Sequence, residues 1–189
     1  GIDSNPDDPG DSDTPGASSW HGTHVAGTVA AATNNSGTGV AGTSWGAKIM
    51  PLRALGKGGG TTYDVAQSIR FSARLSNDSN TLPPRKADII NLSLGSSQAT
   101  NAERDAVAAA IEAGVIIVAA AGNENVSTPF YPAAYEGVIG VSASTITGEK
   151  AYYSNFGNYV DIAAPGGDLT AEQRLGILST YVDGYQSGS

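Results

Sequence analysis

Residues 100–122 read TNAERDAVAAAIEAGVIIVAAAG and hold a helix signal followed directly by a strand signal. Thr100 and Glu103 form a capping-box pattern, apolar residues follow, and Gly114 is a typical helix terminator. Residues 115–121 are short, apolar and rich in Ile and Val, which is typical of a buried strand. A helix that leads into a buried strand is the repeating unit of an α/β domain.

The same alternation extends along the chain on both sides of this stretch. A second helix is predicted from about Thr62 to Ser72, with Val65 and Ile69 on one face. The other strands, which we expect to be mostly buried, are residues 49–55, 87–94, 138–141 and 160–163. Strands that alternate with helices predict a mostly parallel sheet, and ligands collect at the carboxyl ends of its strands.

Composition excludes several classes of protein. A length of 189 residues suits one domain, and 40% hydrophobic with 15% charged residues excludes disorder of the whole chain. The formal charge of −8, without a Lys/Arg cluster, argues against nucleic-acid and anionic-membrane partners. With no Cys, the chain has no disulfide, thiolate zinc site or cysteine nucleophile. Residues 3–16 are rich in Asp and Pro, and we interpret them as a solvated loop rather than a calcium loop.

Both histidines, His21 and His24, lie in WHGTHVAGT at residues 20–28. If the segment is helical, the two rings share a face. Three interpretations compete: inert hydrogen-bonded imidazoles, a pair of metal ligands, or a general base that takes a proton from a hydroxyl nucleophile. Spacing alone does not choose between them.

Two segments at expected strand ends are candidates for substrate contact. Asn123 follows a predicted strand and Gly122, so its amide could stabilise an oxyanion; capping a turn is the alternative. Residues 90–95 end in Ser93, Leu94 and Gly95, and read either as an edge that pairs with an extended peptide or as a core strand.

Together these segments resemble the subtilisin-like serine proteases, the subtilases. HGTHVAGT at 21–28, NLSLG at 91–95 and AAGNE at 120–124 are similar to the family's motifs, and so are 131–134, 154–157 and 163–166 in order. The resemblance implies a three-layer α/β fold in which a mostly parallel central sheet is flanked by helices. It also implies a serine endopeptidase that works through an acyl-enzyme.

The resemblance assigns roles to particular residues. His21 would be the general base and Asn123 the oxyanion amide, whereas His24 would be structural. Substrate would lie extended between two segments and beside the oxyanion strand. The implied substrate-binding residues are Ser93, Leu94, Gly95, Gly58, Gly59, Gly60, Ala120 and Gly122.

Two members of the family's catalytic triad are not in these 189 residues. Gly1-Ile2-Asp3 resembles the continuation of the Asp motif, and Ser187-Gly188-Ser189 resembles the approach to the Ser motif. We therefore interpret residues 1–189 as one incomplete domain, an internal fragment that is inactive alone. Ser189 as the nucleophile is the less favoured interpretation, because the motif needs a Thr before its Ser.

The family also implies a cofactor, partners and a location. Residues 34–42 resemble a calcium loop in which the Asn35 side chain and the carbonyls of Thr38 and Val40 would be ligands; an ion-free glycine-rich turn is the alternative. We expect a secreted monomer whose partners are peptide and protein substrates. The second function class is a non-catalytic subtilase homologue that binds peptides on the same surface.

Overall fold

The computed structural model describes residues 18–34, 36–168 and 176–182. The chain divides into two compact units, one of residues 1–61 with 178–189 and one of residues 62–177. The terminal segments 1–17 and 183–189, which hold the predicted acidic loop and Ser189, lie outside the described residues. The assignment of 1–189 to one domain stays a prediction.

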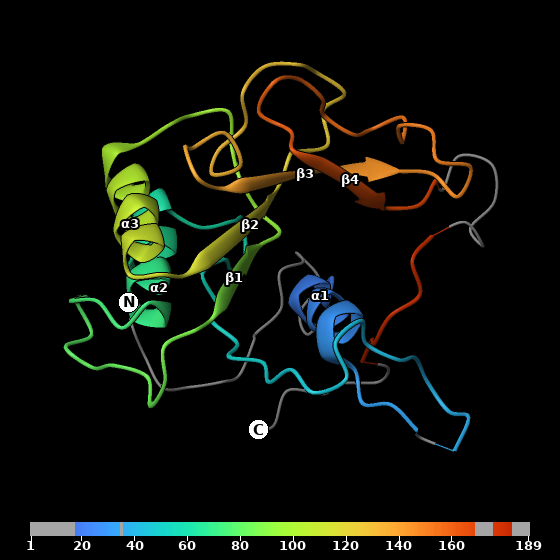
Figure 1. The fold of residues 1–189 in the computed structure, drawn as a ribbon, viewed down its shortest axis with the longest axis horizontal. Helices are drawn as coiled ribbons and strands as arrows, with labels where there is room; N and C mark the ends of the chain where they lie inside the picture. Colours follow the sequence, from blue (N-terminus) through green and yellow to red (C-terminus); the bar gives the residue numbers. More distant parts are fainter. Residues whose placement is uncertain (1–17, 35, 169–175, 183–189) are drawn as a thin grey trace. The chain divides into compact units, whose positions relative to one another are not determined.

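A parallel four-stranded sheet forms the centre of the 62–177 unit (Figure 1). The strands are β1 (Ile89–Leu92), β2 (Ile116–Ala120), β3 (Ile139–Ser144) and β4 (Ile162–Pro165). They neighbour one another in chain order, and every pair is parallel. All the carboxyl ends therefore lie at one edge of the sheet, and the predicted α/β class with a mostly parallel sheet is confirmed.

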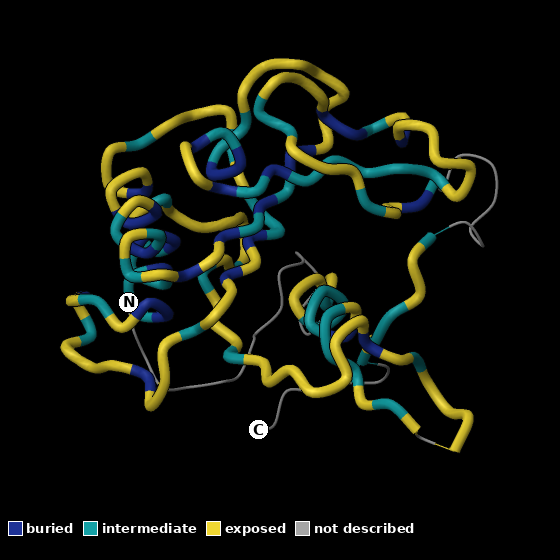
Figure 2. Tube along the Cα trace, in the orientation of Figure 1, coloured by how far each residue is buried: buried dark blue, intermediate teal, exposed yellow. Residues whose placement is uncertain are grey.

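Two helices of this unit, α2 (Thr62–Ser72) and α3 (Asn101–Glu112), pack against each other, and α3 also contacts β2 (Figure 1). Their apolar faces supply much of the core. Ile69 of α2, Val107 of α3 and Ile117 of β2 are buried. Figure 2 shows dark blue, buried segments among the helices and strands of this unit. The predicted helix over 62–72 and the helix between Thr100 and Gly114 are thus confirmed.

Two of the strand predictions need correction. Residues 49–55 form no strand, because no neighbouring backbone in the described part of the chain pairs with them. The four strands are also less buried than expected. Ile89 is 60% exposed, Ile116 51% and Ile162 54%, whereas alternate residues such as Ile117 are buried. An apolar run marks a strand but does not report which of its faces is covered.

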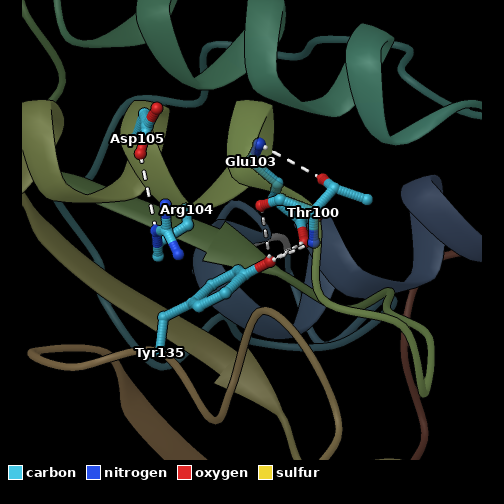
Figure 3. A network of polar contacts seen from close by, with 5 residues as sticks. All are labelled: Thr100, Glu103, Arg104, Asp105 and Tyr135. Carbon is cyan, nitrogen blue, oxygen red and sulfur yellow. Dashed lines mark hydrogen bonds and ion pairs between the residues drawn. The ribbon is translucent and has the colours of Figure 1, made fainter.

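The start of α3 carries half of the predicted capping box (Figure 3). The Thr100 hydroxyl accepts the backbone N–H of Glu103 at 3.3 Å. The reciprocal bond is replaced by Tyr135, whose hydroxyl accepts the Thr100 N–H at 3.0 Å and lies 3.1 Å from Glu103 Oε2. A residue 35 positions away therefore completes a motif that the local sequence assigned to Glu103.

The other unit is built on α1 (His21–Ala30). Its last carbonyls are satisfied by residues 42–44: the N–H groups of Gly42, Thr43 and Ser44 donate to Ala31, Thr28 and Val29. These bonds stabilise the carboxyl end of a short helix whose final carbonyls lack intrahelical partners. Within the described ranges, no helix has the length and hydropathy that a membrane span requires.

Candidate active site

His21 is the first residue of α1 and is exposed. Trp20 before it has φ 53°, so the chain turns sharply where the helix begins. His24 lies one turn later and is half-buried, and its backbone carbonyl accepts hydrogen bonds from Ser179 at 2.6 Å and Thr28 at 3.1 Å. The helix therefore presents one accessible imidazole and one that is partly enclosed by its surroundings.

A carboxyl-terminal segment is held against α1 by side-chain hydroxyls. Ser179 Oγ donates to His24 O at 2.6 Å, and Thr180 Oγ1 donates to Thr23 O at 2.8 Å. Gly27 makes this approach possible: a Cβ there would overlap Thr180 Oγ1 and lie 2.6 Å from Ser179 Oγ. The histidine helix and residues 179–180 thus belong to the same compact unit.

Asn123 lies beyond the carboxyl end of β2, after the buried Ala121 and Gly122. Its residue is exposed, and within the described residues its side-chain amide makes no hydrogen bond. It borders a surface cavity of about 220 Å³ at the carboxyl edge of β2, β3 and β4. Tyr153 also lines this cavity, and burial raises the pKa of its hydroxyl. An amide that is free to donate therefore stands at the edge where the fold predicts a ligand.

The 93–97 segment lies beside a second cavity in the same unit, of about 310 Å³. Ser96 pairs with Tyr131 through two backbone hydrogen bonds of 2.8 Å, which fix the segment after Gly95. Phe130 closes the space between two glycines: a Cβ on Gly95 would lie 2.5 Å from its ring, and a Cβ on Gly122 would lie 3.0 Å from it. The remaining lining residues are Ser97, Glu124, Val126, Thr128 and Pro129.

The predicted second substrate segment, Gly58 to Gly60, lies in the unit of α1 and is exposed. Gly56 and Gly59 exchange backbone hydrogen bonds of 2.8 and 3.0 Å, so the segment makes a tight turn. Gly58 and Gly59 have φ of 80° and 100°, a region that side chains disfavour. These backbone angles explain why glycines occupy this turn. Their contact with substrate stays a prediction.

The predicted calcium loop is a turn in which Asn34, Ser36, Gly37 and Gly39 have positive φ. Asn35 itself lies outside the described residues. No hydrogen bond from the described part of the chain reaches the Thr38 or Val40 carbonyls. Calcium takes about 6–8 oxygen ligands. The described ranges hold no cluster of three or more acidic or His side chains, so an ion at this loop would depend on amide and backbone carbonyl oxygens.

The predicted site residues fall into two groups. His21, Gly58 to Gly60, Thr38 and Val40 lie in the unit of α1; Ser93 to Gly95, Ala120, Gly122 and Asn123 lie in the sheet unit. Within the sheet unit, the ends of β1 and β2 bring the second group to one edge. Sequence reasoning gave no role to Phe130, Glu124 or Asn155. Glu124 and Asn155 lie within quoted motifs and Phe130 lies beside one, and this position was their only signal, since side-chain contacts across 31 residues leave no local pattern.

Comparison with known proteins gives a consistent result. The profile of the subtilase family matches residues 2–188. The extracellular protease of Xanthomonas campestris pv. campestris is 43% identical over 174 residues, which cover 90% of this chain and 30% of that protein. Thermitase of Thermoactinomyces vulgaris is 40% identical over 154 residues, which cover 81% of this chain and 51% of thermitase.

A solved structure is similar along almost the whole chain. It is that of a protease from Pseudoalteromonas arctica PAMC 21717, with a TM-score of 0.90 and 42% identity. The match covers 99% of this chain and 58% of that one. The chain thus spans between about a third and about three-fifths of the relatives it matches.

Proposed function

The chain belongs to the subtilase family, and on that premise we propose that it is the middle part of a secreted serine endopeptidase. The observation that supports this most directly is the exposed, unbonded amide of Asn123 at the carboxyl edge of a parallel sheet. The exposed imidazole of His21 at the first position of α1 supports it as well. Each of the two residues is exposed, as a group that acts on a substrate must be.

In the proposed mechanism a serine from outside these residues attacks the carbonyl carbon of the scissile bond. His21 takes the hydroxyl proton, and the carbonyl oxygen becomes an oxyanion that accepts a hydrogen bond from the Asn123 amide. When the C–N bond breaks, His21 returns the proton to the leaving amine and an acyl-enzyme remains. Water then attacks the ester, with His21 acting again as base, and the acid product and free serine are released. An aspartate from outside the chain would orient the imidazole.

Substrate would bind as an extended strand beside residues 93–95. Gly58 to Gly60 are proposed as a second substrate-binding segment. The residue before the scissile bond would enter the cavity of about 310 Å³ that Gly95 and Phe130 line. Because the Phe130 ring occupies the space between Gly95 and Gly122, we propose that this pocket prefers small and medium side chains. Ala120 and Gly122 would contact the substrate backbone.

We propose a structural calcium ion at residues 34–42, held by Asn35, the Thr38 and Val40 carbonyls, and ligands from outside the described residues. The unbonded carbonyls support this idea, and no catalytic step depends on the ion. Calorimetric titration of the longer protein with calcium tests it, and absence of uptake would remove it. Secretion is proposed from the relatives, which are named extracellular proteases.

The decisive experiment compares residues 1–189 with the longer protein that the proposal requires. We expect the longer protein to cleave a chromogenic peptide anilide and to lose that activity on treatment with a sulfonyl fluoride, which sulfonylates an activated catalytic serine with loss of fluoride. Residues 1–189 alone should be inactive. Peptide cleavage by residues 1–189 alone would contradict the proposal. A longer protein that does not cleave the peptide, or that cleaves it and is not inhibited by the sulfonyl fluoride, would also contradict it, and absence of cleavage would favour the peptide-binding alternative.

A further inference from the structure

Asn155 is a fully buried side chain with 0% exposure, in the 154–157 segment between β3 and β4. A buried amide without hydrogen-bond partners destabilises the folded state, so the groups that Asn155 binds indicate which part of the fold it stabilises. Four hydrogen bonds of its side chain go to one short segment, residues 121–126, which includes Asn123. Burial raises the pKa of the Tyr159 hydroxyl, and a further interaction with Asn155 offsets part of that rise.

The oxygen and the nitrogen of the Asn155 amide bind different groups of this segment. Oδ1 accepts the backbone N–H groups of Glu124 at 2.9 Å and Val126 at 3.2 Å. Nδ2 donates to the carbonyl of Ala121 at 3.0 Å and to Glu124 Oε2 at 2.8 Å. The amide therefore uses two donors and two acceptor positions, its full capacity.

The network reaches Asn123 through one further bond. The same Glu124 oxygen that Asn155 binds accepts the backbone N–H of Asn123 at 2.9 Å. Gly122 completes the fit: a Cβ there would overlap Asn155 Nδ2, and its φ is 106°. The Ala121 carbonyl is also bound by the Tyr159 hydroxyl at 2.9 Å. The backbone on both sides of Asn123 is thereby fixed from the buried side, while its own amide stays exposed.

We propose that Asn155 is a positioning residue for catalysis: it locks the 121–126 segment so that the Asn123 amide is preorganised to meet the oxyanion. The proposal rests on the proposed function. The amide is needed for two reasons. Alanine would leave the backbone N–H groups of Glu124 and Val126 without an acceptor, and aspartate would lose both N–H donors and place a second carboxylate beside that of Glu124, which repels it. Preorganised donors stabilise a transition state more than donors that must first be ordered.

Asn77 provides a matched control in the same unit. It is a buried amide, 8% exposed, whose Nδ2 donates to Leu75 and Thr81 carbonyls at 3.0 and 2.9 Å. Its Oδ1 accepts the Ser79 N–H at 3.0 Å. It fixes the loop after α2 in the same way that Asn155 fixes residues 121–126, but it has no bond to that segment. Losing it should destabilise the fold without moving Asn123.

The test is a double-mutant cycle in the longer, active protein. Asn155→Ala and Asn155→Asp should each lower kcat on the order of 100-fold, as loss of an oxyanion donor does, with KM changed less than about threefold. In the Asn123→Ala background, Asn155→Ala should lower kcat less than about threefold further, because both act through one group. Asn77→Ala should lower Tm comparably and leave kcat unchanged. Equal kcat for Asn155→Ala and wild type, or multiplicative losses in the double variant, would overturn the proposal.

Hydrogen–deuterium exchange separates this inference from the proposed function. In wild type the amides of residues 121–126 should exchange slowly; Asn155→Ala should speed them at least tenfold, and Asn77→Ala should not. If the longer protein has no peptidase activity, the proposed function fails. Hydrogen–deuterium exchange then still tests whether Asn155 holds residues 121–126 in place, and unchanged exchange of these amides in Asn155→Ala overturns that claim. Should Asn155→Ala fail to fold, Asn155→Asp carries the comparison through the lost donor bonds to Ala121 and Glu124, and unchanged exchange in that variant would overturn the same claim as well.

Discussion

The Oε2 atom of Glu103 lies 3.1 Å from the hydroxyl oxygen of Tyr135 in the core of the sheet unit (Figure 3). The Glu103 residue is only 3% exposed. Burial raises the pKa of this carboxyl, and the hydrogen bond from Tyr135 offsets part of that rise. The Tyr135 hydroxyl also lies 3.2 Å from the Thr100 carbonyl. The Tyr135 hydroxyl has one proton, which the Glu103 carboxyl and the Thr100 carbonyl share as acceptors.

Glu103→Gln should therefore remove a pH dependence of stability. The folded-state pKa lies above the unfolded-state value, so the folded protein holds the proton more tightly between the two. The stabilisation is complete below the unfolded-state pKa and is lost as the pH rises through the folded-state pKa. Glutamine mimics the neutral acid, so urea unfolding of the variant should lack this decline. Glu112→Gln, at the exposed end of α3, should keep it; an equal decline in Glu103→Gln would contradict the prediction.

His21→Ala should lower kcat of the longer protein by at least about 1,000-fold, because no other described group is assigned to take the serine proton. His24→Ala is the matched control on the same helix, and it should lower Tm but keep kcat within about tenfold of wild type. Steady-state kinetics with a peptide anilide measure both. A larger loss for His24→Ala than for His21→Ala would reverse the assignment.

Asn123→Ala should lower kcat on the order of 100-fold with little change in KM, since the amide binds the oxyanion and not the ground state. Asn125→Gly is the control in the same loop. Asn125 has φ 55°, which glycine tolerates, and its Oδ1 binds Lys150 at 2.7 Å. The control should keep kcat within about threefold. Comparable losses of kcat in both variants would indicate a general disturbance of the loop.

Gly27→Ala should destabilise the packing of residues 179–180 on α1. The added Cβ would push aside the hydroxyls of Ser179 and Thr180, which bind helix carbonyls. We expect a loss of about 1–3 kcal/mol in the free energy of unfolding. Gly22→Ala, on the same helix with no atom within 4 Å of its Cβ, should instead gain up to about 1 kcal/mol. Denaturant unfolding of both variants checks this, and equal effects would contradict it.

Phe130→Ala should change substrate preference by opening the space between Gly95 and Gly122. The kcat/KM for peptides with a large aromatic residue before the scissile bond should rise about tenfold relative to those with alanine. Phe156→Ala is the control, since this ring is 43% exposed, faces Lys150 and lies outside the cavity's lining. An unchanged preference in Phe130→Ala would show that the ring does not limit the pocket.

Local patterns in the sequence predict the α/β class, both helices of the sheet unit and the approximate positions of the four strands. Those features are local: a capping Thr100, a terminating Gly114 and an apolar run such as 115–121 act within a few residues. The sequence also singled out His21 and Asn123, through motifs whose residues are adjacent in the chain. Residues 49–55 are the exception, because an apolar run becomes a strand only where a neighbouring backbone completes its ladder.

The distant side chains that complete these local features could be identified only from the folded chain. Tyr135 takes the place of half a capping box 35 residues earlier, and Asn155 holds a segment about 30 residues before it. Phe130 fills the space that Gly95 leaves open. The physical reason is the same in each case. A hydrogen bond or a packed ring joins atoms that come into contact only when the chain folds, and the spacing of residues in the sequence does not indicate such contacts.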